Sequence, residues 1–137
     1  MSNEVFLRFP SISSNVSIAR IAAATFASFC GFSVSDIEEI KVAVSEAVSN
    51  AILHAYPDSP GCIECFVKNS GEGIEITVED HGKGIDDLDK AKEPGFTTIP
   101  GHMGLGFTFM ESFMDKLQIE SMPGKGTRIR MVKNPCL

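Results

Sequence analysis

The fold of this chain is decided by residues 45–54, SEAVSNAILH. When each residue advances about 100° around a helix, Val44 and Val48 fall on one apolar stripe, which predicts a helix with a core-facing side. Glu46 and Asn50 stand four residues apart, so both project from the same side of that helix, away from the stripe. The segment therefore predicts a core helix that also presents a carboxylate and a carboxamide.

The side of the helix that carries Glu46 and Asn50 is not an ordinary solvent face. Val42, Ala43 and Leu53 lie on it too, so we expect the helix to be covered on two sides. Polar groups that are half buried in an apolar surface need partners. The pair is therefore a candidate binding site, although on this helix alone a solvated Glu and a chance Asn explain the pattern equally well.

Length and composition predict one soluble globular domain spanning residues 1–137. The chain is 43% hydrophobic and 22% charged, and its net charge of -6 argues against nucleic acid as a partner. No apolar run approaches the ~20 residues of a membrane span, and the first residues do not form a signal peptide. We therefore expect a cytoplasmic location and no membrane partner.

The cysteines do not indicate a metal centre. Cys62 and Cys65 are spaced as C-x-x-C, but they fall in a predicted strand, where residues three apart point to opposite faces. A structural zinc ion needs four ligands, and no second C-x-x-C follows. Metal or redox chemistry at these residues is therefore not favoured.

Strands and helices are expected in segregated runs along the chain. This order predicts an α+β two-layer sandwich, with helices on one face of a mixed, mostly antiparallel sheet. We expect a strand ending at Pro10, a helix capped within 11–14 and ending near Gly31, a second helix capped by Ser33 or Ser35 and ending before Pro57, strands at 62–68 and 74–79, a helix at 107–114, and a closing hairpin of 117–120 with 127–132.

A second motif, D-x-G-x-G, follows the strand at 74–79. Asp80 continues the inward phase of Ile76 and Val78, and a carboxylate at the end of a core-facing row is costly unless something donates to it. Gly82 and Gly84 permit close approach of backbone and ligand. A turn with a capping Asp explains this motif equally well when it is taken alone.

Two further glycine motifs complete the pattern. Residues 101–107, GHMGLGF, open a helix, whose free amides are suited to an anion; a flexible loop is the default interpretation of G-x-G alone. In 124–127, GKGT, Thr127 shares its phase with Ile129 and Met131 and should face inward. Taken alone, that motif is better explained as a hairpin turn.

Taken together and in this order, the four motifs resemble those of the GHKL superfamily of ATPases and kinases, which have the Bergerat fold. The resemblance covers nearly the whole chain. Residues 39–52, 96–98 and 106–111 are, more closely, similar to the anti-sigma F factor family of spore-forming bacteria. Anti-sigma B kinases of the general stress response share most of these motifs.

The resemblance implies roles for the motif residues. Glu46 would be the general base that polarises the acceptor hydroxyl, and Asn50 would give an oxygen to Mg²⁺. Asp80 would hold the amino group of adenine, with Gly82 and Gly84 letting the base lie close.

The same resemblance extends to the phosphate side and to the edge of the base. Gly104 and Gly106 would present amides to the phosphates, and Thr127 would support the adenine edge. An ATP lid at about 92–106 would include Thr97 and Thr98. The link at 99–103, IPGHM, departs from the family because it is shorter and lacks Lys or Arg.

The family also implies partners. It binds ATP and Mg²⁺, forms a homodimer, binds an alternative sigma factor, and phosphorylates a serine of an anti-anti-sigma protein. Arg20, alone among small residues on the outer side of the first helix, is a candidate partner anchor; a solvated surface Arg is the alternative.

The competing function is a module of the same fold that senses ATP or ADP without phosphoryl transfer. A histidine-kinase fragment is less favoured, because there is no room for a phosphoacceptor helix pair.

Overall fold

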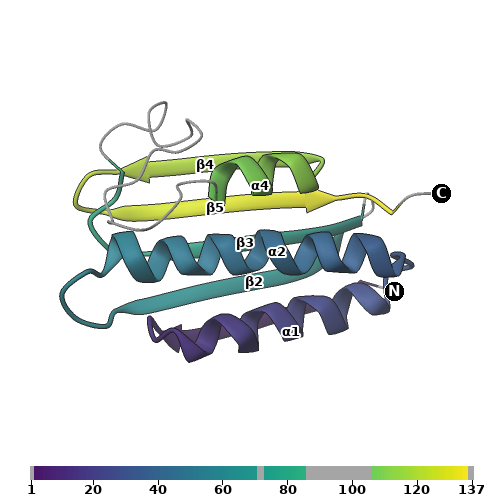
Figure 1. Cartoon of the computed structure of the whole chain (residues 1–137), viewed down its shortest axis with the longest axis horizontal. Helices are drawn as coiled ribbons and strands as arrows, with labels where there is room; N and C mark the ends of the chain where they lie inside the picture. Colours follow the sequence, from purple (N-terminus) through teal and green to yellow (C-terminus); the bar gives the residue numbers. More distant parts are fainter. Residues whose placement is uncertain (1, 71–72, 86–105, 136–137) are drawn as a thin grey trace.

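The computed structural model describes residues 2–70, 73–85 and 106–135, and Figure 1 shows their arrangement. In these residues a five-stranded sheet is combined with helices. The elements are β1 Glu4–Pro10, α1 Ser14–Ser28, α2 Val34–Asn50, the π-helix η1 Ala51–Ala55, β2 Cys62–Ser70, β3 Gly73–Asp80, α4 Gly106–Phe113, β4 Lys116–Met122 and β5 Gly126–Lys133.

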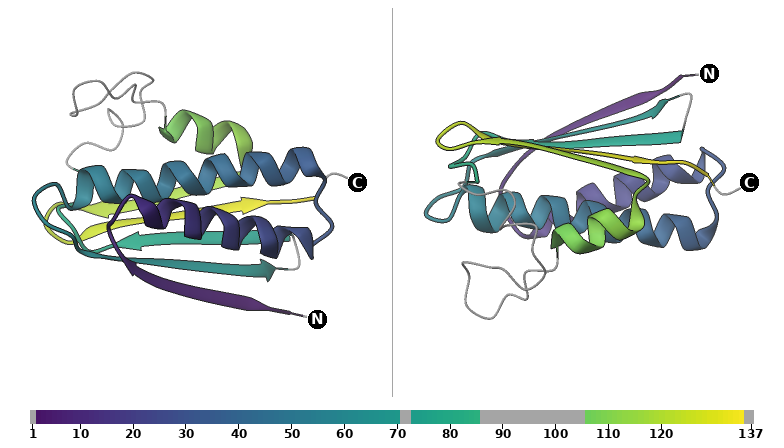
Figure 2. Two further views of the ribbon diagram at one scale, coloured as in Figure 1. Left: turned by 60° about the horizontal axis from the view of Figure 1, so that its bottom comes forward. Right: turned by 90° about the horizontal axis from the view of Figure 1, so that it is seen from above.

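The sheet has the strand order β1-β2-β3-β5-β4, and each neighbouring pair is antiparallel. The helices lie on one face of the sheet (Figure 2). The expected two-layer α+β sandwich is therefore confirmed. The sequence predicts a mixed, mostly antiparallel sheet, whereas all pairs among the described strands are antiparallel.

Helix α2 is the centre of the helical layer, with α1 on one side and α4 on the other (Figure 1). Its core stripe, which includes Ile40, Val44 and Val48, is completely buried. Ala43, on the second apolar side, is completely buried as well, whereas Val42 remains 37% exposed. The second side of the helix is therefore covered only in part, since Leu53 is half buried.

Local signals fix where α2 begins. Ser33 Oγ accepts from Asp36 N at 3.1 Å, and Ser33 N donates to Asp36 Oδ2 at 3.4 Å, so the two residues form a reciprocal capping box. Of the two expected caps, Ser33 is the one used. This box defines the start of the helix that carries Glu46 and Asn50.

The end of α2 differs from the expectation. The α-helix ends at Asn50, and the chain then continues as the π-helical turn η1 through Ala55 instead of as regular helix up to Pro57. Such turns are rare and are often found at functional sites. Glu46 and Asn50 keep their one-turn spacing, because both belong to the regular part of the helix.

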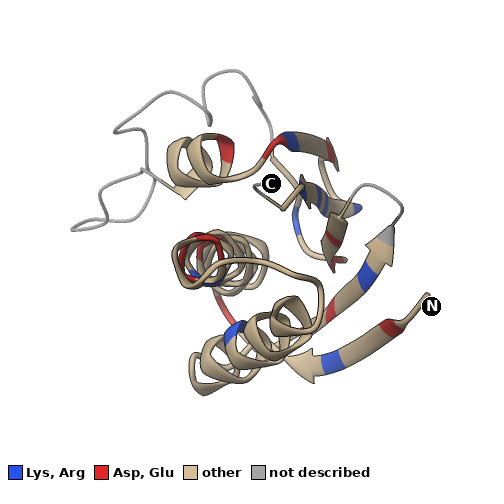
Figure 3. Cartoon of the chain, turned by 90° about the vertical axis from the view of Figure 1, so that its right-hand side faces the viewer, with Lys and Arg blue, Asp and Glu red and all other residues tan. Residues whose placement is uncertain are grey.

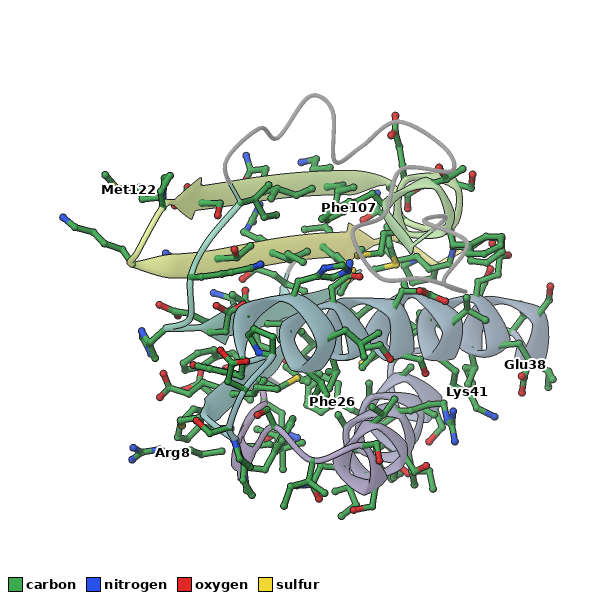
Figure 4. All side chains as sticks on the ribbon, turned by 60° about the vertical axis from the view of Figure 1, so that its left-hand side comes forward. Arg8, Phe26, Glu38, Lys41, Phe107 and Met122 are labelled. Carbon is green, nitrogen blue, oxygen red and sulfur yellow. The ribbon has the colours of Figure 1, made fainter. Side chains whose placement is uncertain are left out.

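Helix α1 is anchored to the core by Phe26, which is 6% exposed and lies beside α2 in Figure 4, whereas Arg8 extends from β1 away from the layers. Ser13 precedes α1, but its side chain makes no capping hydrogen bond. Ser11, another expected cap, instead accepts from Gly61 N at 2.9 Å, because it still lies beside the sheet where β1 ends. None of the helices in the described residues is long and apolar enough to cross a membrane.

Lys133 links three elements at the end of β5. Its Nζ donates to the carbonyl of Phe113 at 2.6 Å and lies 3.8 Å from Glu39 Oε2 on α2. The last carbonyls of a helix lack partners within the helix, and a cation there is favourable. Lys133 is buried, so this bond fixes the end of α4 against β5 and α2.

We predict that Lys133→Met lowers the free energy of unfolding by about 1–3 kcal/mol, because the carbonyl of Phe113 loses a charged donor in a buried place. Urea denaturation measures the change. Lys125→Met, in the exposed β4–β5 turn, is the control and should change stability by less than about 0.5 kcal/mol. Equal effects of the two substitutions would contradict the prediction.

Candidate functional site

The structure brings Glu46 and Asn50 together with the start of α4. Both side chains are half buried on α2. A Cβ at Gly106 would lie 3.0 Å from Glu46 Oε2 and 3.3 Å from Asn50 Nδ2, which is tighter than most side chains tolerate. Glycine at this position therefore lets the first turn of α4, with its free amide groups, begin directly beside the acid and the amide.

Asn50 is incompletely satisfied. Its Nδ2 is buried and has no hydrogen-bond partner among the residues that the structure describes. A buried polar group without a partner is destabilising by about 1–3 kcal/mol. Rotation of the amide by a half-turn exchanges its nitrogen and its oxygen, so the buried end can present either a donor or an acceptor to a bound group.

A second cluster surrounds Asp80, the last residue of β3. The carboxylate is buried, and its Oδ1 accepts from Gly82 N at 3.0 Å and from Thr127 N at 3.2 Å. Asp80 and Thr127 are also direct partners across the β3–β5 ladder. Both side chains are buried, as their predicted inward phase requires.

Burial raises the pKa of the Asp80 carboxyl, although the hydrogen bonds from Gly82 and Thr127 oppose the shift. The ionised group therefore costs the folded protein free energy. Both amide bonds use Oδ1, which leaves Oδ2 without a hydrogen bond from the described residues. A ligand donor at Oδ2 would stabilise the ionised form.

The glycines of the D-x-G-x-G motif make room for the chain itself. A side chain at Gly82 would collide with the backbone carbonyl of Ala55, and one at Gly84, which has φ +75°, would collide with that of Met122. These contacts give a physical reason for both glycines without any ligand. Their role in letting a base lie close stays a prediction.

Thr127 has a partner that the sequence did not reveal. Its Oγ1 lies 2.8 Å from Ser121 Oγ, which also accepts from Ile85 N at 2.7 Å. Ser121 and Thr127 are direct partners across the β4–β5 ladder. Only the register of that hairpin, which the GKG turn sets, would have indicated the pair from sequence.

The two clusters are joined through the end of η1. The carbonyl of Ala55 accepts from Lys83 N at 3.3 Å, and the same carbonyl faces Gly82. Asn50 and the turn that follows Asp80 are thus separated by one turn of π-helix and one backbone contact.

The other predicted residues do not belong to these clusters. Arg20 lies on α1, where it is the only charged residue and donates to Ser17 Oγ at 3.2 Å; Figure 3 shows how little charge this helix carries. Ile18 and Ile21 beside it are 57% and 59% exposed. Thr97, Thr98, Gly104 and the rest of the expected lid, up to residue 105, lie outside the described residues.

Comparison with known proteins identifies the family. The histidine kinase-like ATPase domain matches residues 9–133. An anti-sigma F factor from Thermoanaerobacter is 47% identical over 134 residues, covering 96% of this chain and 94% of the relative. The anti-sigma F factor of Bacillus subtilis is 42% identical over 137 residues, covering 98% of this chain and 94% of the relative. The chain belongs to the anti-sigma F factor family.

Solved structures agree on the fold of this anti-sigma F factor family member. The RsbU and RsbW domains of a Mycobacterium tuberculosis protein match with a TM-score of 0.71 at 20% identity, over 96% of this chain and 32% of that one. The histidine kinase domain of an Erythrobacter litoralis blue-light activated histidine kinase matches with a TM-score of 0.57 at 19% identity, over 90% of this chain and 60% of that one. The expected GHKL-type fold is confirmed, and its ATPase domain class implies ATP binding.

We predict that Asp80→Asn makes the ligand-free protein more stable at pH 7. Burial raises the pKa of Asp80 in the folded protein above its value in the unfolded chain. At pH values above the folded-state pKa, the ionised carboxylate therefore lowers the free energy of unfolding by its full amount. This stability cost disappears as the pH falls to the unfolded value of about 3.9. The stability difference between variant and wild type should therefore shrink over that pH range, as measured by urea denaturation at several pH values.

Asp58→Asn, in the exposed turn before β2, serves as the control for this pH series. Its stability difference from wild type should stay small at each pH. A loss of stability in Asp80→Asn at pH 7 would show that the carboxylate stabilises the empty protein and would contradict the prediction.

Proposed function

We propose that this chain is an anti-sigma factor with protein serine kinase activity: it binds an alternative sigma factor and, with Mg-ATP, phosphorylates a serine of an anti-anti-sigma protein. The observation that supports it best is Asn50 beside Glu46, whose buried Nδ2 has no hydrogen-bond partner among the described residues, in a domain of the histidine kinase-like ATPase family.

The Asp80 cluster would bind the base of ATP. A buried carboxylate with one oxygen already engaged by two amides accepts from a donor such as the 6-amino group of adenine. Thr127, held by Ser121, would support the edge of the base beside it. Binding the amino group would also relieve the cost of keeping Asp80 ionised.

The Asn50 cluster would bind Mg²⁺ and the phosphates. Asn50 would give its amide oxygen to Mg²⁺, which takes oxygen ligands and few of them from protein. The first amides of α4, freed by Gly106, would contact phosphate oxygens. Bound there, ATP would supply the phosphoryl group, and Mg²⁺ would offset the negative charge of its phosphates.

Glu46 would act as the general base. It lies one helical turn before Asn50, and its Oε2 faces the start of α4. A carboxylate held there would take the proton of the attacking serine hydroxyl as the phosphoryl group is transferred. Without this group the same fold would sense ATP or ADP without phosphorylating a partner.

The partners follow from the family. A second copy of the chain would complete a homodimer, and a role in sporulation would fit the relatives' names. Arg20, with the exposed Ile18 and Ile21 beside it, would anchor the sigma factor or the anti-anti-sigma protein on α1. Nucleic acid is not expected to bind directly, because the chain is acidic.

Phosphate transfer from labelled ATP to a purified anti-anti-sigma protein tests the proposal. We predict that Glu46→Gln keeps ATP binding and lowers kcat by about 10²–10⁴-fold, because Gln preserves the shape but cannot accept a proton. Glu38→Gln is the matched control, since Glu38 lies at the opposite end of α2 (Figure 4) and pairs only with Lys41 among described residues. Wild-type kcat in Glu46→Gln would remove the catalytic role of Glu46, whereas no phosphate transfer by the wild-type chain would leave the sensing module.

We predict that Asn50→Ala abolishes most of the gain in ATP affinity that Mg²⁺ gives, because the amide oxygen proposed to bind the metal is missing. Calorimetric titration with ATP, with and without Mg²⁺, measures it. ATP affinity without Mg²⁺ should change much less. An unchanged Mg²⁺ dependence would place the metal at other residues.

A further inference from the structure

Tyr56, the residue after η1, is bound to two strands at once. Its hydroxyl donates to the carbonyl of Cys62, at the start of β2, at 2.8 Å, and accepts from His81 N, just after β3, also at 2.8 Å. Its ring lies so close to Gly61 that a side chain there would overlap it. Both the ring and the hydroxyl are therefore held in one place.

The hydroxyl stands where the β2–β3 ladder would otherwise continue. Ile63 and Asp80 are the last paired residues, so Cys62 and His81 would form the next pair. Instead, the hydroxyl of Tyr56 is inserted between the amide of His81 and the carbonyl of Cys62. The insertion ends the ladder at Asp80 and directs the following turn away from β2.

That turn carries the groups that orient Asp80. Gly82 N donates to Asp80 Oδ1, while Lys83 N donates to Ala55 O, the residue before Tyr56. The backbone of residues 81–83 is thus held by two consecutive residues, Ala55 and Tyr56. If the hydroxyl were absent, the amide of His81 could pair directly with Cys62, and the turn would move toward β2.

We propose that Tyr56 is a positioning residue for nucleotide selection: its hydroxyl holds the 81–83 turn so that Asp80 faces the base in the orientation that favours an amino group. This inference rests on the proposed function, because it assigns to Tyr56 the geometry of that nucleotide site. Tyr56 does not contact the nucleotide; it acts through His81 N and, beyond it, through Asp80.

The side chain of His81 takes no part in the hydrogen bond to Tyr56. It points to Glu64, with 3.0 Å between Nε2 and Oε1, and it is 55% exposed. The bond to Tyr56 uses the backbone amide of His81, which any residue except proline supplies. His81→Ala therefore keeps the bond to Tyr56 and serves as the matched control.

We predict that Tyr56→Phe, which keeps the ring and removes only the hydroxyl, weakens ATP binding about tenfold, a change of about 1.4 kcal/mol. GTP, which has no 6-amino group, should be affected much less, so the ATP-over-GTP preference falls by nearly the same factor. Calorimetric titration of each nucleotide with Mg²⁺ measures both constants. The ratio of the ATP and GTP binding constants does not depend on the fraction of protein that is folded, because unfolding weakens both apparent constants equally.

Gly61→Ala provides a second variant, because its methyl group would displace the ring of Tyr56 and move the hydroxyl away from His81. It should lower the ATP-over-GTP ratio in the same direction, and it should add little in the Tyr56→Phe background, since both changes remove one interaction. His81→Ala should keep the wild-type ratio.

The outcomes separate the two proposals. An ATP-over-GTP ratio that is unchanged in Tyr56→Phe, even with a lower Tm, would make Tyr56 purely structural and overturn this inference alone. Failure of the wild-type chain to bind ATP would overturn the proposed function and this inference with it. A lower ratio in both variants, with a normal ratio in His81→Ala, is the expected result.

Discussion

Burial of one helix on two sides is the constraint on which the rest of this structure depends. Helix α2 packs its Val44 and Val48 stripe into the core, and its second side is covered in part, with Ala43 fully buried. A helix held on two sides has little freedom to rotate. Glu46 and Asn50 are therefore fixed relative to the sheet by packing alone, and the first turn of α4 can approach them only because residue 106 is glycine.

Asn50 and Asp80 are imperfectly satisfied, and both lie in the proposed nucleotide site. Asn50 Nδ2 is buried without a partner among the described residues, and burial raises the pKa of Asp80 against two amide donors. Proteins commonly accept a stability cost at functional sites. By contrast Lys133, buried at the opposite end of α4, is fully used by Phe113 and Glu39. The contrast supports the assignment of Asn50 and Asp80 to the proposed binding site.

The two halves of the site are joined by local chain continuity. Asn50 ends the α-helix, η1 follows, and Ala55 and Tyr56 then hold the turn after Asp80. The distance between the proposed phosphate side and the proposed base side is therefore set by one π-helical turn and a few backbone hydrogen bonds. This connection explains why a substitution at Tyr56, which is outside both clusters, is expected to change nucleotide selection.

The sequence by itself determined the periodic features. Apolar spacing around Val44, strand alternation leading to Asp80, and the capping signal at Ser33 each depend on neighbours within a few residues, and so they were predictable, as was the pairing of Glu46 with Asn50 on one helix face. The ordered motifs also identified the family.

Tertiary structure alone decided the π-turn after Asn50, the diversion of Ser11 from helix capping to Gly61, and the partners Ser121 and Tyr56. Each of these depends on backbone groups that come from distant parts of the chain. No local pattern encodes such a meeting, because it exists only once the strands and helices have packed.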